Sequence, residues 1–233
     1  MIFIKRFLLG CDLAKSLDFT SFAIIEMESP DNNSDPAYHL RGLDRVRGVE
    51  YPAITKLIIT TIERLEKEPD TKDGPHLCLD ASGLGAPIRD YLKAEKIFTN
   101  RMKIYPVVFT GGEAARCDPA TGNYNISKTL IVSNFLSLMQ HRRFDYSPDL
   151  QALPLLEQEI SSFKRHLTPS GKNTFDAEAG EHDDLICAIC IPLIIGEWQY
   201  RKAAVPICAP DTSDANNWNS RWAPLGDAAQ PWR

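Results

Sequence analysis

The sequence predicts one α/β domain built on a mixed sheet, in which three antiparallel strands are followed by parallel strands and helices flank the sheet. The chain has 233 residues, 43% of them hydrophobic, which is enough for one substantial core and little for two. Three apolar stretches of strand length, separated by polar turns, come first. Strand-length and amphipathic helical stretches then alternate, which favours parallel pairing.

The three opening strands are expected at residues 5–12, 22–28 and 38–46. The first is an apolar run that ends in Asp12, and the polar stretch at 15–20 provides a hairpin turn to the second. In the third stretch apolar and polar residues alternate imperfectly, which indicates a more exposed strand. We therefore expect these strands to pair antiparallel in chain order.

A helix is expected next, over residues 52–67, because Pro52 suits a helix start and apolar residues follow at 3.6-residue spacing. The elements that follow are a strand at 76–80, a helix at 86–96, a strand at 103–109 and a helix at 126–141. This order of strand, helix and strand predicts that the later strands lie parallel to each other.

The C-terminal part is less regular. Residues 155–163 are ambiguous between helix and strand, and we assign their later part, with 172–175, to a peripheral hairpin. A last apolar helix is expected over 181–200. We place the domain at residues 1–202 and a tail rich in Pro, Asn and Trp at 203–233, where tryptophans either bind a partner or dock back onto the domain.

Charge and composition exclude few functions. The net charge of −5 neither proves nor excludes a nucleic-acid partner, because a local basic groove can bind phosphate in an acidic protein. No apolar stretch is long enough to cross a bilayer, and the N-terminus lacks signal-peptide order, so a cytoplasmic protein without membrane contact is expected. The CxxC pair Cys187 and Cys190 lies in an apolar helix, which favours core packing over a zinc site.

Four aspartates stand where apolar runs meet turns or helix starts. Asp12 and Asp80 end predicted strands, while Asp183 and Asp184 lie in the expected first turn of the last helix. Any one of them could simply cap a turn or a helix. A carboxylate at a buried strand end needs a partner for its lost hydration, and no nearby lysine or arginine obviously supplies one. The combination predicts a site for Mg²⁺ or Mn²⁺, which prefer oxygen ligands.

Such a set of carboxylates suits phosphodiester hydrolysis. Two divalent ions about 3.5–4 Å apart can activate a water for in-line attack and stabilise the leaving 3′ oxygen. In this scheme Asp12 bridges both ions, while Asp80 supports one and Asp183 the other. Asp184 serves as a further ligand or orients water. The sequence thus predicts a two-metal-ion nuclease, a hydrolase.

Short motifs in a fixed order carry a resemblance to a known family. They are Gly10-Cys11-Asp12-Leu13-Ala14 with Asp18-Phe19-Thr20, then Asp80-Ala81-Ser82-Gly83-Leu84-Gly85, then Lys128-Thr129-Leu130, and last His182-Asp183-Asp184-Leu185. Over roughly residues 8–200 the chain resembles the nuclease domain of the large terminase subunit of tailed bacteriophages or prophages. The order, the glycine-rich turn after Asp80 and the His-Asp-Asp helix start are its most specific parts.

The resemblance implies an RNase H-like fold and a metal-dependent endonuclease that cuts concatemeric double-stranded DNA during genome packaging in the bacterial host cytoplasm. It implies a small terminase subunit and a portal protein as partners. The implied ligands are Asp12, Asp80, Asp183 and Asp184. Asp18, Lys128 and His182 are possible assisting residues, although Asp18 is equally suited to a turn and His182 to polar surface.

The sequence departs from a complete large terminase because it has no GxxxxGK[ST] phosphate loop. We therefore expect any ATPase motor to lie on another polypeptide or in a segment removed from this chain. A junction resolvase, a ribonuclease H and a transposase-like enzyme share the same chemistry, and a non-catalytic packaging assembly module is the alternative outside enzymes. Basic residues that would contact DNA phosphates are Arg89, Lys93, Lys128, Arg142, Arg143, Lys164 and Arg165.

Overall fold

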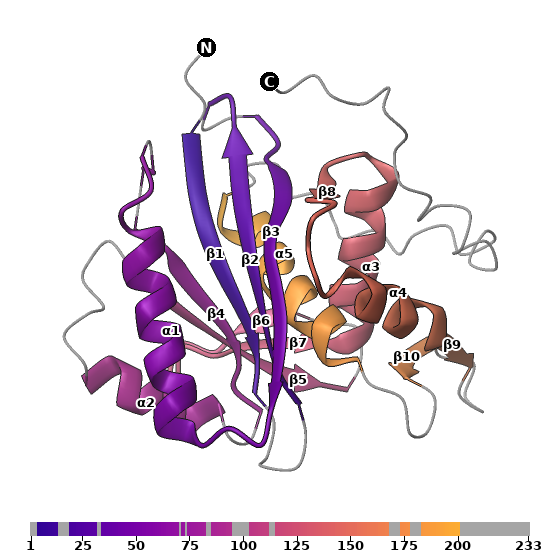
Figure 1. The fold of residues 1–233 in the computed structure, drawn as a ribbon. Coiled ribbons are helices and arrows are strands. Elements are labelled where there is room, and N and C mark those ends of the chain that lie inside the picture. Colours follow the sequence, from indigo (N-terminus) through magenta and orange to yellow (C-terminus); the bar gives the residue numbers. More distant parts are fainter. Residues whose placement is uncertain are drawn as a thin grey trace.

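The computed structural model describes residues 4–13, 19–31, 34–69, 71–72, 74–82, 85–94, 103–111, 115–167, 173–177 and 183–200. Within these residues one eight-stranded mixed sheet carries helices on both faces (Figure 1). Its strands are β1 (Ile4–Asp12), β2 (Phe19–Ser29), β3 (Ala37–Arg47), β4 (His76–Asp80), β5 (Ile104–Thr110), β6 (Ala115–Cys117), β7 (Tyr124–Ser127) and β8 (Phe144–Tyr146). Their order across the sheet is β6-β7-β5-β4-β1-β2-β3-β8.

The predicted strand pairing is confirmed. β1 pairs antiparallel with β2, from Ile4 opposite Ser29 to Asp12 opposite Ser21, and β2 pairs antiparallel with β3. On the other side of β1, β4 lies parallel to it and β5 lies parallel to β4. The second strand is longer than expected, since it begins at Phe19, inside the stretch assigned to the turn.

The short strands β6, β7 and β8 were not predicted. Each has three or four residues, too few for an alternation that could be read from sequence. The helix expected over 126–141 accordingly begins later, as α3 (Lys128–Gln140), because Ile126 and Ser127 pair with β5. The Ser127 side chain accepts a hydrogen bond from the Leu130 amide at 3.2 Å and so caps the helix.

The remaining helices are α1 (Tyr51–Leu65), α2 (Gly85–Ala94), α4 (Leu153–Ser162) and α5 (Asp184–Tyr200). The ambiguous stretch at 155–163 is thus mainly helical. A peripheral hairpin is present as predicted, since β9 (Phe163–Leu167) pairs antiparallel with β10 (Asn173–Ala177) in a separate two-stranded sheet. Its first strand was placed too early, because the later part of 155–163 belongs to α4 and only Phe163 of that stretch lies in β9. None of the described helices combines the length and apolar character that crossing a membrane requires.

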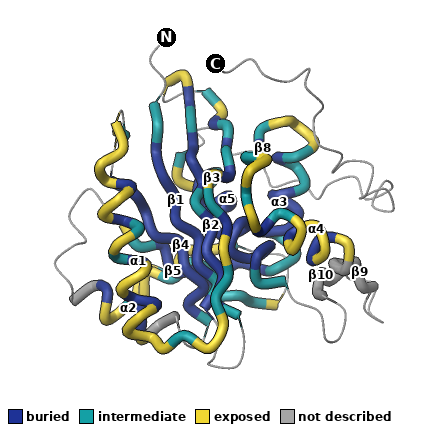
Figure 2. Tube along the Cα trace, in the orientation of Figure 1, coloured by how far each residue is buried: buried dark blue, intermediate teal, exposed yellow. Residues whose placement is uncertain are grey.

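Two apolar clusters cover the two faces of the sheet. One holds buried residues of α1 and α2 against Leu9 and Leu77, and the other holds α3, α4 and α5 against Leu8 and Cys78. Because side chains alternate along a strand, Leu8 and Leu9 belong to opposite clusters. Figure 2 shows the central strands and α5 in the colour of buried residues, between more exposed helices.

Helix α5 is buried on all sides except at its two ends, and it lies directly on β1. Every residue from Leu185 to Gly196 is buried. A methyl group added at Gly10 would lie 1.9 Å from the Ala188 carbonyl oxygen, so only glycine allows this approach. Arg6, at the other end of β1, lies over the Tyr200 ring at 4.5 Å. Helix α5 therefore runs antiparallel to β1 and begins at the end of the strand that carries Asp12.

Candidate metal centre

The ends of β1 and β4 place two carboxylates next to each other. In the parallel register Cys11 lies opposite Leu79, so Asp12 and Asp80 follow at neighbouring strand ends, which are separated by roughly 4.8 Å in such sheets. By alternation Asp12 shares the face of Gly10, and Asp80 shares the face of Cys78, which packs in the α5 cluster. Both side chains therefore face the layer of α5.

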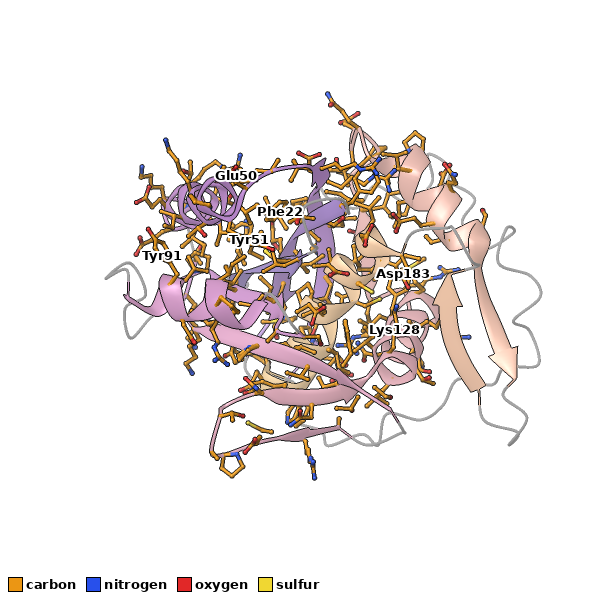
Figure 3. The ribbon with its side chains drawn as sticks, turned by 90° about the horizontal axis from the view of Figure 1, so that it is seen from below. Phe22, Glu50, Tyr51, Tyr91, Lys128 and Asp183 are labelled. Carbon is orange, nitrogen blue, oxygen red and sulfur yellow. The ribbon has the colours of Figure 1, made fainter. Side chains whose placement is uncertain are left out.

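The start of α5 brings two further carboxylates to this edge. The Asp183 carbonyl accepts a hydrogen bond from the Cys187 amide at 2.9 Å, and the helix itself begins at Asp184. Asp183 is therefore the N-cap residue. The sequence prediction, which placed Asp183 in the first turn of the helix, is wrong on this point. Its carboxylate Oδ2 lies 2.5 Å from Lys128 Nζ at the start of α3, and Figure 3 shows the two residues side by side.

The four carboxylates interact electrostatically. Burial raises the pKa of Asp12 well above its usual value, and Asp80, Asp184 and Asp183 raise it further, while Lys128 opposes them. Burial also raises the pKa of Asp80, although the Ser82 amide donates a hydrogen bond to its carboxylate at 2.7 Å and lowers it. The structure thus gathers Asp12, Asp80, Asp183 and Asp184 at one edge of the sheet, which we call the acidic edge.

Lys128 corrects one expectation, since a lysine distant in sequence does supply a partner. Its ammonium pairs with Asp183 and lowers the pKa values of Asp12 and Asp80. A cation at a helix N-terminus is disfavoured by the helix dipole, and Lys128 is the first residue of α3. The surrounding carboxylates offset that cost and explain its position.

The donor set fits a hard divalent cation in its chemistry. All four acidic side chains offer oxygen, the donor that Mg²⁺ and Mn²⁺ prefer. The neighbouring thiol of Cys187 stays protonated because burial raises its pKa well above the usual value, and Cys190 is buried too. Within the described part of the chain, no three His, Cys, Asp or Glu side chains are placed to hold one ion as they stand. The cation that lies beside the Asp183 carboxylate in this structure is the ammonium of Lys128.

Glu159 was missed by the sequence prediction. It lies on α4 with only 4% of its surface exposed. Its Oε2 accepts hydrogen bonds from the amides of Leu185 (3.0 Å) and Ile186 (3.2 Å), and Arg45 Nη1 donates to its Oε1 at 3.2 Å. The sequence signal was a glutamate three residues after Leu156 and next to Ile160, which places a charge on the apolar face of the helix.

Glu159 predicts a pH dependence of stability. Burial, with a smaller contribution from Asp184, raises its pKa from 4.5 to about 7. A carboxyl group whose folded pKa is raised contributes stability that is complete below pH 4.5 and lost as the pH rises through about 7. We expect the metal-free protein to lose on the order of 2 kcal/mol relative to Glu159→Gln between pH 5 and pH 8. Urea unfolding of both proteins at the two pH values checks this, and a constant difference would contradict it.

The other predicted residues fall outside this edge or outside the described residues. Asp18, His182 and the tail at 203–233 lie outside the described residues, as do the side chains of Lys93, Lys164 and Arg165. Arg89 binds Asp90 and Asn123. Arg143 follows the C-terminal end of α3, opposite Lys128, and binds Glu197, so Arg142 and Arg143 are not part of the acidic edge.

Solved structures share this fold, although no protein-family profile and no curated protein matches the chain. The large terminase nuclease from thermophilic phage G20c aligns with a TM-score of 0.54 and 16% identity over 84% of this chain and 83% of that one. The large terminase nuclease domain of Thermus phage P74-26 aligns with a TM-score of 0.52 and 16% identity over 82% and 78%. The chain has the fold of a large terminase nuclease domain. The RNase H-like mixed sheet is thereby confirmed.

The terminase nuclease fold is also represented by metal-bound structures. The G20c nuclease has been solved with bound magnesium, at a TM-score of 0.52, and with bound cobalt, at 0.53, each 17% identical over 82% of this chain and 81% of that one. At this identity the likeness establishes the terminase nuclease fold. The function of this chain must be argued from its own residues.

Proposed function

We propose that this chain is a metal-dependent endonuclease that hydrolyses phosphodiester bonds of double-stranded DNA. The observation that carries the proposal is the gathering of four carboxylates at one sheet edge, where each of the other three raises the pKa of Asp12. Carboxylates that repel one another in a buried setting are stabilised in their charged form by a bound cation. The terminase nuclease fold and its metal-bound relatives support the same proposal.

The proposed ligands of two Mg²⁺ or Mn²⁺ ions are Asp12, Asp80 and Asp183, with Asp184 as a further ligand or an orienting group. When bound, such ions supply Lewis-acid activation of water and of the phosphodiester. Asp12, on the central strand, is the proposed bridging ligand. Lys128, whose ammonium lies beside Asp183, would also be suited to neutralise a backbone phosphate.

Genome packaging belongs to the same proposal. By resemblance to large terminase subunits, the DNA would be concatemeric viral DNA, and the partners would be a small terminase subunit, a portal protein and an ATPase motor domain on this or another polypeptide. The setting would be the cytoplasm of a bacterial host. The acidic edge itself supports the hydrolysis step in this proposal.

Cleavage of supercoiled plasmid tests the proposed function. We expect nicking or linearisation with Mn²⁺ or Mg²⁺, none with a chelator, and loss of cleavage in Asp183→Asn. An RNA–DNA hybrid of equal length serves as the competing substrate. Cleavage that persists with the chelator or in Asp183→Asn would rule out this centre, and cleavage of the hybrid alone would favour a ribonuclease H.

Lys128 should compete with the metal. We expect Lys128→Met to bind Mn²⁺ about tenfold more tightly than the parent at pH 8, because a positive charge beside the carboxylates is removed. The metal-free variant should unfold at a lower temperature, since the repulsion is no longer balanced. Isothermal titration calorimetry and thermal unfolding measure the two effects. Lys128→Arg, which keeps the charge, is the control, and weaker Mn²⁺ binding by Lys128→Met would contradict the assignment.

A further inference from the structure

The start of α5 is capped by a carboxylate that comes from another helix. The first amides of a helix have no partner within the helix, and Leu185 and Ile186 are too deeply buried to use water. Oε2 of Glu159, on α4, accepts hydrogen bonds from both amides at 3.0 and 3.2 Å. A carboxylate at this position also suits the positive end of the helix dipole.

These two amides are the ones that an N-cap side chain normally binds. Asp183 is the N-cap residue of α5, so Leu185 and Ile186 occupy the second and third helical positions. An aspartate at the N-cap would usually accept a hydrogen bond from one of them. The Asp183 carboxylate instead pairs with Lys128 at the acidic edge. Glu159 has taken over the capping role that would otherwise occupy Asp183.

The same glutamate is also hydrogen-bonded to β3, close to the end of β1 that carries Asp12. Arg45 Nη1 donates to Glu159 Oε1 at 3.2 Å, and the Arg45 guanidinium lies over the Phe19 ring at 4.2 Å. Arg45 is paired in register with Ser21, which is paired with Asp12. Glu159 therefore connects the strand edge to the helix start.

We infer that Glu159, held by Arg45, is a positioning residue that caps α5 in place of Asp183 and so leaves the Asp183 carboxylate directed at the acidic edge. The inference rests on the proposed function, because it assigns Glu159 a role in preparing the proposed metal ligands. Both oxygens of Glu159 already accept N–H donors, so it is not itself proposed as a ligand. Groups that orient metal ligands typically change metal affinity 10–100-fold when removed.

Two measurements on the metal-free and metal-titrated chain test this role. In Glu159→Ala the Leu185 and Ile186 amides lose their acceptor, and Asp183 is expected to turn back and cap one of them, which leaves the other without an acceptor. We expect faster hydrogen exchange at the amide that stays uncapped without metal, and a Kd for Mn²⁺ at pH 8 that rises by about tenfold or more. Glu159→Gln keeps an oxygen acceptor and should recover most of the amide protection.

Glu157→Ala is the matched control, since it removes the same charge from an exposed position on the same helix. It should leave both the exchange rates and the Kd for Mn²⁺ near those of the parent. If Glu159→Ala does not fold, Arg45→Met removes the residue that holds the carboxylate and should also weaken Mn²⁺ binding. Circular dichroism establishes which variants are folded.

The outcomes separate this inference from the proposed function. The positioning role alone would be overturned if the parent binds Mn²⁺ and Glu159→Ala binds it with the same affinity. The same holds for Arg45→Met where that variant is used instead. Equal losses of Mn²⁺ affinity in Glu159→Ala and Glu157→Ala would also overturn it. Such losses would show that removal of a negative charge from α4 weakens binding wherever that charge lies. A parent that neither binds Mn²⁺ nor cuts DNA would overturn both the inference and the metal centre.

Discussion

Asp12→Asn is expected to abolish metal-dependent cleavage and to raise the unfolding temperature of the metal-free protein. Asp12 lies at the centre of the acidic edge, and its pKa is raised by burial and by Asp80, Asp183 and Asp184. Because burial and the neighbouring carboxylates disfavour the charged form of Asp12, the neutral amide that replaces it in this variant should stabilise the fold at pH 8. The same substitution removes the proposed bridging ligand, so stability should rise while cleavage is lost. Such a trade-off between stability and activity is common at functional sites.

The size of each effect can be bounded. Removing groups that only orient a metal ligand reduces affinity or activity 10–100-fold, so losing the ligand itself should reduce plasmid cleavage by more than about a hundredfold. Thermal unfolding should shift upward by about 2–4 °C for each kcal/mol of relieved repulsion. Asp149→Asn, at an exposed position, is the control. Parental cleavage by Asp12→Asn would remove the foundation of the proposed mechanism.

Gly10→Ala is expected to damage the packing between β1 and α5. The added methyl group would meet the Ala188 carbonyl oxygen at 1.9 Å and two carbons of Pro192 at 2.8 Å. Proline at position 192 has no amide to bind that carbonyl, and neither the helix backbone nor the proline ring can rotate away. The helix must therefore shift, at a cost of about 1–3 kcal/mol or more.

The shift should also disturb the metal centre, because Gly10 is two residues from Asp12 and α5 carries Asp184. Urea unfolding measures the stability, and calorimetric titration of Mn²⁺ measures the site. Gly111→Ala is the matched control, since an added methyl group there would meet nothing within 4 Å. Equal stability of Gly10→Ala and Gly111→Ala would show that β1 and α5 do not approach this closely.

Much of the fold could be predicted because its long elements carry their own patterns. The run ending in Asp12 and the run ending in Asp80 are strands of nine and five residues, and parallel strands end at one edge. Their convergence therefore followed from strand order alone. The final helix was also recognisable, although its start at Asp184 depends on hydrogen bonds that composition does not reveal.

The short edge strands could not be predicted in the same way. Ile126 and Ser127 were expected in a helix, and they form a strand because β5 offers them backbone partners. Three or four residues have too little periodicity to favour either state. A neighbouring strand decided the outcome, since tertiary pairing overrides local propensity.

The sequence by itself determined the mixed sheet, the apolar last helix and the four aspartates as candidate ligands, because side-chain periodicity and chain order are local properties. Only the tertiary structure decided what surrounds those aspartates. Lys128 reaches Asp183, and Glu159 reaches the start of α5, across long intervals of sequence. Such partners are chosen by burial, since a desolvated charge or amide must be matched by whichever group the packed layers bring beside it.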